Sequence, residues 1–83
     1  MSDERKLAAT IQRLFQELFD VPAERLTDKT RRGELERWDS LGHLRLVGEL
    51  SDAFGIEIPP DSALEMETVE DIKRIVSGIL ERT

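Results

Sequence analysis

The sequence predicts a small all-α domain, and three observations lead to that prediction. The chain has 83 residues, which is enough for one domain with one modest hydrophobic core. Three stretches carry apolar residues at the spacing of a helix face. The one stretch with strand-like alternation, residues 55–58, has no second strand to pair with. We therefore expect three main helices and one short helix in a single domain over residues 1–83.

The first helix is expected over about residues 3–19. The polar and acidic residues at the beginning of the chain suit a helix N-terminus. The apolar residues that recur on one face are Leu7, Ile11, Leu14, Phe15 and Leu18. The helix should end before Pro22, because proline disfavours helical geometry in the residue that precedes it.

Residues 20–38 show no sustained periodicity and are rich in charge, so we expect a long ordered loop. Leu26, Leu35 and Trp38 are the side chains that would anchor it on the core. Loops of this length inside a compact domain are uncommon and often functional. Its place directly before Ser40 is therefore informative.

The second main helix is expected over residues 40–54, with Asp39 as its N-cap and Gly55 as its stop. Its apolar surface is wider than one packing face needs. One stripe contains Leu46, Leu50, Ala53 and Phe54, and a neighbouring arc contains Leu41, Leu44 and Gly48 with Ser40 and Ser51. One part should bury in the core, and the other meets either a transient partner or the chain's own neighbouring segments.

The last third of the chain predicts an extended segment, a short helix and a final helix. Ile56 and Ile58 should pack inward, and the proline pair at 59–60 should start a short helical turn over residues 61–64. Thr68 and Asp71 have the spacing of a capping box at the start of a helix that runs to about residue 82. The apolar face of that helix consists of Val69, Ile72, Ile75, Val76 and Ile79.

The chain carries a formal net charge of -6 and contains no cysteine. A nucleic-acid binder needs a clustered basic surface, so we expect no nucleic-acid partner and favour basic partners instead. Without cysteine the chain has no disulfide, no thiol nucleophile and no cysteine-based metal site. The polar start MSDERKLAAT and the short apolar runs predict neither a secretory signal nor a membrane span. We expect a cytoplasmic monomer.

The stretch ERWDSLGHL, residues 36–44, places Asp39, Ser40 and His43 close together, as a hydrolytic triad would require. Ser40 and His43 are three residues apart on the expected helix and can approach each other. Asp39, however, is expected to cap the helix, and the hydrolase type of glycine-flanked nucleophile turn is missing. We therefore expect no catalytic residues and no metal site. His43 is favoured as a partly buried histidine, hydrogen-bonded near the helix start.

A helix start offers free N–H groups and the positive end of the helix dipole, and both favour a phosphate on a first-turn residue. A serine that receives a phosphodiester there needs no base of its own, because another enzyme can supply the base and the metal. This accounts for Ser40 at a helix start without a triad.

The stretch WDSLGHLRLVGELSDAFGIEIP resembles the acyl carrier protein family, whose signature is Asp-Ser-Leu at the start of the second helix. The similarity is that of a freestanding bacterial carrier and covers nearly the whole chain. It implies a four-helix, acyl-carrier-like bundle in which a phosphopantetheinyl transferase attaches 4′-phosphopantetheine from coenzyme A to Ser40. The thiol of this arm would carry acyl intermediates as thioesters and present them to acyl-loading and acyl-using biosynthetic enzymes. The protein would be a carrier and no enzyme.

The resemblance also implies roles for residues around Ser40. The transferase would read Asp39 and Leu41, and partner enzymes would grip Leu44, Val47 and Gly48 on the second helix. His43, one turn from the attachment point, is a candidate neighbour of the phosphate.

The sequence departs from many fatty-acid carriers in charge. Those carriers follow the serine-leucine pair with an acidic residue and further acids, whereas Gly42, His43 and Arg45 occupy that stretch here. The departure favours a specialised pathway, polyketide-like or for a modified sugar, over housekeeping fatty-acid synthesis. Two alternatives stay open at this point. One is an aminoacyl or peptidyl carrier of a nonribosomal pathway, and the other is a helical interaction module that is never modified.

Overall fold

The computed structural model describes residues 2–82, and every regular element in that range is helical apart from one isolated β-bridge. The elements are α1 (Ser2–Phe19), the 3-10 turn η1 (Ala23–Arg25), α2 (Ser40–Phe54), α3 (Pro60–Leu64) and α4 (Val69–Arg82). The predicted all-α class is confirmed, with three main helices and one short helix. Sequence reasoning missed η1 within the loop and the β-bridge between Arg31 and Thr68.

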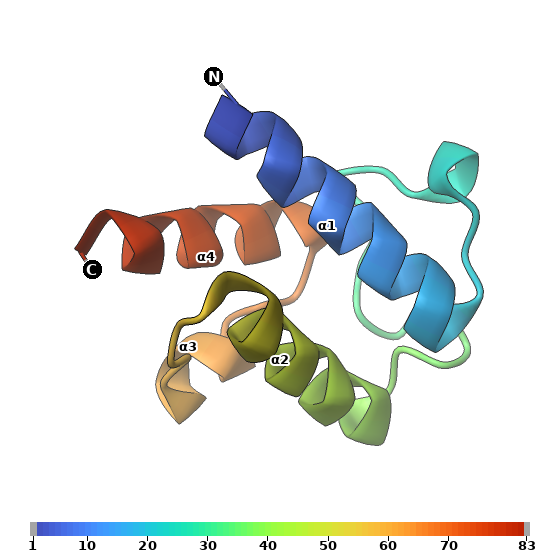
Figure 1. Ribbon diagram of the computed structural model, residues 1–83. Helices are drawn as coiled ribbons and strands as arrows, with labels where there is room; N and C mark the ends of the chain where they lie inside the picture. The colour runs from blue at the N-terminus through green and yellow to red at the C-terminus, as the bar shows by residue number, and fades with distance from the viewer. Residues whose placement is uncertain (1, 83) are drawn as a thin grey trace.

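The helix α1 is the centre of the arrangement, because both α2 and α4 pack against it (Figure 1). The short α3 lies beside α2, and the long loop fills the end of the bundle where α1 finishes and α2 begins. No helix within residues 2–82 is long and apolar enough to cross a membrane.

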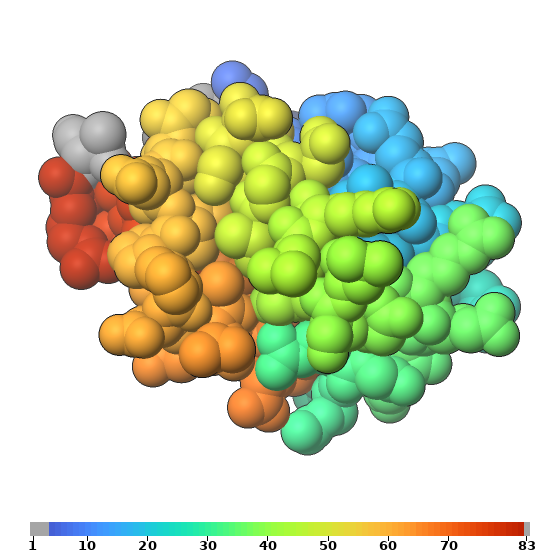
Figure 2. All heavy atoms as spheres, turned by 90° about the horizontal axis from the view of Figure 1, so that it is seen from below, coloured from blue at the N-terminus to red at the C-terminus, as the bar shows by residue number. Residues whose placement is uncertain are grey.

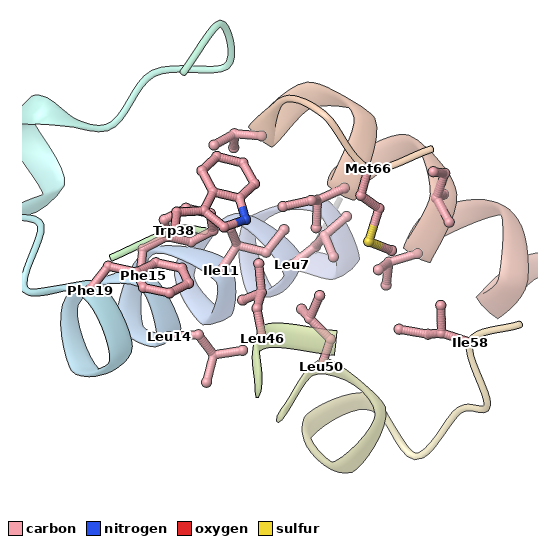
Figure 3. Packing of buried hydrophobic residues seen from close by; sticks show 14 of the residues in the cluster. Leu7, Ile11, Leu14, Phe15, Phe19, Trp38, Leu46, Leu50, Ile58 and Met66 are labelled. Atoms are coloured by element: carbon pink, nitrogen blue, oxygen red, sulfur yellow. The ribbon is translucent and has the colours of Figure 1, made fainter. Parts of the chain in front are cut away.

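The core lies between these helices and contains the residues that helical periodicity selected (Figure 3). Trp38 is fully buried and makes edge-to-face contact with Phe15, with ring centroids 4.9 Å apart, so the end of the loop is fixed on α1. Leu26 and Leu35 pack against the same cluster. One expected member is wrong: Ala53 is exposed.

The helix ends follow local chemistry. Past the end of α1, Asp20 adopts left-handed geometry with φ 58°, two residues before Pro22. Gly55, at φ 63°, ends α2 as expected. At α4 the capping box is confirmed: the Asp71 amide donates to Thr68 Oγ1 at 3.1 Å, and the Thr68 amide donates to Asp71 Oδ2 at 3.2 Å.

The loop over residues 20–38 is ordered because its backbone bonds to the segment that starts α4. The amides of Val69 and Glu70 donate to the carbonyls of Thr30 and Asp28, at 3.1 Å and 2.9 Å. The Arg32 amide donates to the Glu67 carbonyl at 2.7 Å. The loop therefore reaches Ser40 with its path already set by α4 and by the buried Trp38.

Candidate functional site

Ser40 is the first residue of α2 and is exposed. Asp39 caps the helix as predicted, since its Oδ1 accepts from the Gly42 amide at 2.8 Å. The amides of Ser40 and Leu41 have no acceptor among residues 2–82, nor does the Ser40 hydroxyl have a protein partner there. The serine therefore presents a free hydroxyl at the positive end of a helix dipole.

Gly42 holds α2 tightly against the loop. A Cβ atom at this position would collide with the Arg37 carbonyl oxygen and would lie 2.9 Å from Cε1 of Phe19. Only glycine permits this approach, which is a stronger requirement than the moderate helix penalty suggested by the sequence alone. Packing therefore explains why Gly42 occupies the position at which many fatty-acid carriers have an acidic residue.

His43 is buried, and both of its ring nitrogens bond to protein atoms. Trp38 Nε1–H donates to His43 Nδ1 at 3.0 Å, and His43 Nε2 lies 2.8 Å from the Ala63 carbonyl oxygen. Burial lowers the pKa of His43 below its ordinary value of 6.5; the bond to Ala63 raises it, and the charge of Arg32 lowers it further. The expectation of a buried, hydrogen-bonded histidine is confirmed.

These bonds leave His43 unable to act as a base for Ser40 and leave no free nitrogen on its ring for a phosphate. A nucleophilic serine needs a base within hydrogen-bond reach, whereas both ring nitrogens of His43 are hydrogen-bonded to Trp38 and Ala63. Asp39, the third member of the apparent triad, is bonded to the Gly42 amide. The three side chains are neighbours in sequence without forming a catalytic unit, and the idea of His43 as a phosphate neighbour has no nitrogen to support it.

An exposed apolar face extends from the serine along α2. Leu41 is 62% exposed and Leu44 is 69% exposed, while Val47 is half-buried and Gly48 is exposed. Leu64 of α3, also 69% exposed, was missed by sequence reasoning because it lies outside the α2 pattern. Figure 2 looks onto this side of the molecule, where α2 lies between the loop and the segment around α3.

Two arginines flank the start of α2. Arg37 and Arg45 line a hollow of about 330 Å³ together with Asp39, Leu41 and Gly42. Neither guanidinium has an ion-pair partner among residues 4–82, whose side chains the structure describes. Because Glu36 and Asp39 line the same hollow, the surface next to Ser40 combines exposed leucines with charges of both signs.

The site fits a covalently attached phosphate group. The Ser40 side chain is exposed, and its hydroxyl has no partner in the described part of the chain. The amides of Ser40 and Leu41, which have no acceptor there either, favour an anion. No side chain needs to move to make the hydroxyl accessible.

Comparison with known families gives the class of protein. Residues 9–76 match the family model described as a phosphopantetheine attachment site. That match covers α2, α3 and most of α1 and α4, so it spans the fold as well as the short motif around Ser40.

Individual relatives are more specific. The acyl carrier protein of Rubrobacter xylanophilus is 32% identical over 83% of this chain and 85% of its own length. Those of Thermobifida fusca and Lactobacillus johnsonii are 30% and 33% identical, covering 83% and 80% of this chain and 87% and 82% of their own. The chain belongs to the acyl carrier protein family, and its prosthetic group is covalently bound 4′-phosphopantetheine.

Proposed function

We propose that Ser40 is the attachment residue and that the protein carries acyl groups without catalysing their chemistry. The observation that carries the proposal is the exposed, unpaired Ser40 hydroxyl at the first residue of α2, inside the region that the family model matches. When bound, the arm supplies the thiol that the cysteine-free chain lacks and holds the acyl group as a thioester.

In this proposal the residues around Ser40 hold the helix start in place and stabilise the attached phosphate. Asp39 holds the first turn of α2 in place, and the amides of Ser40 and Leu41 stabilise a phosphodiester anion. Ser40 Oγ would form the new bond to phosphorus as the pyrophosphate bond of coenzyme A breaks. The adenosine 3′,5′-bisphosphate portion would leave, and the serine proton would pass to a base on the transferase. His43 cannot take that proton from where it lies, because both ring nitrogens are bonded.

We further propose that the transferase recognises the protein through contacts with Asp39 and Leu41. Partner enzymes bind the next part of α2, at Leu44, Val47 and Gly48. The exposure of the two leucines supports this surface, since large apolar side chains at a protein surface commonly mark an interface. Leu64 of α3 extends the same surface beyond α2.

The charge next to Ser40 supports a specialised pathway, polyketide-like or for a modified sugar. Arg37 and Arg45 lack ion-pair partners among the described residues, and the helix acids Glu49 and Asp52 lie toward the far end of α2. A partner enzyme would therefore meet charges of both signs near the arm, with Arg37 and Arg45 beside Glu36 and Asp39, and only acids further along α2. The acyl group on protein isolated from its native cells tests this proposal: a polyketide or other dedicated intermediate is expected, and only simple saturated fatty acyl chains would contradict it.

The attachment proposal is tested by intact mass. The protein is incubated with coenzyme A, Mg²⁺ and a broad-specificity phosphopantetheinyl transferase, and we expect it to gain the mass of one phosphopantetheine group. Ser40→Ala should gain nothing, whereas Ser51→Ala on the same helix should behave as the unsubstituted protein does. A folded sample that gains no mass while a control carrier reacts would favour the unmodified interaction module instead.

A further inference from the structure

Two hydrogen bonds of His43, one buried and one partly buried, connect three segments around the candidate site. The indole N–H of Trp38 can only donate and the carbonyl of Ala63 can only accept. The ring of His43 between them must therefore be neutral, with its proton on Nε2 and a lone pair on Nδ1. The bonds join the end of the loop, the first turn of α2 and the helix α3.

From the interior of the protein, these two hydrogen bonds support the residues that position Ser40. Trp38 directly precedes the capping Asp39, and Gly42, next to His43, packs on the Arg37 carbonyl. A shift of the Trp38 ring would move the backbone that leads into α2. The ring also contacts Phe15 and Phe19 of α1, which leaves it little room to find another acceptor.

We propose that His43 is a positioning residue for the modification of Ser40, and that protonation of its ring opens the bond to Trp38 and loosens the start of α2. The part of the inference that concerns modification rests on the proposed function. The hydrogen-bond switch itself does not.

The surroundings of the ring make protonation disruptive. A proton on Nδ1 would face the Trp38 N–H, so two donors would meet where one bond now exists. Arg32 of the loop is the charged group that acts on the ring, and it opposes a second positive charge. Among residues 4–82, no carboxylate of the loop or of α1, α2, α3 or α4 accepts a hydrogen bond from the ring, so none would compensate.

The direction of the pH effect follows from the lowered pKa of His43. Between the ordinary value of 6.5 and the lower folded value, the unfolded chain binds a proton that the folded chain does not. The contribution of neutral His43 to the free energy of unfolding is therefore fully present above pH 6.5. It is lost as the pH falls through the pKa of His43 in the folded protein.

The first experiment uses the fact that the chain has one histidine and one tryptophan. In ¹⁵N NMR spectra at pH 7, we expect His43 to show an unprotonated Nδ1, and the Trp38 indole signal to shift as the histidine titrates below pH 6.5. Trp38→Phe, which keeps an aromatic ring but removes the donor, should move the pKa of His43 toward its ordinary value. The proposed hydrogen-bond switch would be overturned if the neutral ring carried its proton on Nδ1. It would also be overturned if the Trp38 indole signal did not change while His43 titrates.

The second experiment measures modification of folded protein by the transferase. Trp38→Phe should lose about tenfold in kcat/KM at pH 7.5, the factor that corresponds to one net buried hydrogen bond. His43→Gln, which cannot titrate, should show a flatter rate profile than the unsubstituted protein between pH 5.5 and 7.5, when both are corrected with a control carrier. Unchanged kcat/KM and identical profiles would overturn the positioning role. Failure of the unsubstituted protein to react at all would instead contradict the proposed function, while the NMR titration would still report on the bond.

Discussion

At position 42 the loop and the second helix come closer than any side chain allows. The Arg37 carbonyl and the Phe19 ring occupy the space where a Cβ atom would be, and the Gly42 amide is also the donor that Asp39 caps. The absence of a side chain therefore belongs to the packing that holds Ser40 at the start of α2.

A pair of glycine substitutions tests this packing. Gly42→Ala should destabilise the protein by about 1–3 kcal/mol, because the methyl group forces the backbone of Arg37 to move. Gly48→Ala is the matched control on the same helix: a Cβ atom there meets nothing within 4 Å, and alanine should gain about 0.5–1 kcal/mol in a helix interior. Urea unfolding followed by circular dichroism measures both. Equal stabilities of the two variants would contradict the tight contact.

The sequence could predict only part of this residue-level picture. Asp39 as a cap and His43 as a buried histidine follow from local position, and both are confirmed. The partner of His43 Nε2 could not be predicted, because Ala63 is 20 residues away and is brought near only by the placement of α3. The requirement at Gly42 was hidden for the same reason, since it depends on the path of the loop.

At the scale of elements, the start of α4 is held by several hydrogen bonds to one carboxylate, that of Asp71. The Asp71 carboxylate accepts from the amides of Glu67 and Thr68 and from Arg74. Burial works to raise the pKa of Asp71, but the hydrogen bonds from Arg74 and the two amides outweigh it, and the pKa lies below its ordinary value of 3.8. The carboxylate therefore stabilises α4 only while it is ionised.

The pH dependence of stability tests this junction. The contribution of Asp71 should be present above about pH 4 and lost as the pH falls through its lower folded pKa. The difference in unfolding free energy between the unsubstituted protein and Asp71→Asn should shrink between pH 5 and pH 2. Glu70→Gln is the control in the same turn, since the Glu70 side chain has no hydrogen-bond partner among residues 2–82. An Asp71→Asn difference that stays constant with pH would contradict the assignment.

Helix boundaries were predictable where caps and periodicity agree. The observed bounds of α2 and α4 match those expected, and α1 and α3 each begin one residue earlier. The loop was the element that local rules could not trace. Its order comes from backbone bonds to residues 67–70 and from the isolated β-bridge between Arg31 and Thr68, which are contacts between distant parts of the chain.

At the scale of the whole molecule, the packing of the helices leaves Ser40 exposed at the start of α2. The core combines buried residues of α1, α2 and α4 with Trp38 of the loop, whereas Ser40 is exposed. Charge is uneven across the chain: residues 41–83 hold nine acidic and four basic side chains, whereas residues 1–40 hold nine and eight. The surface around Ser40 thus combines a helix start, two exposed leucines and charged side chains of both signs.

The most direct test of this account is to locate the added group within the chain. Trypsin cleaves after Arg37 and Arg45, and it releases residues 38–45, in which Ser40 is the only hydroxyl side chain. Fragmentation of that peptide from transferase-treated protein should place the whole phosphopantetheine mass on Ser40. An unmodified 38–45 peptide from protein that has gained the mass would contradict the account, because the arm would then be attached elsewhere.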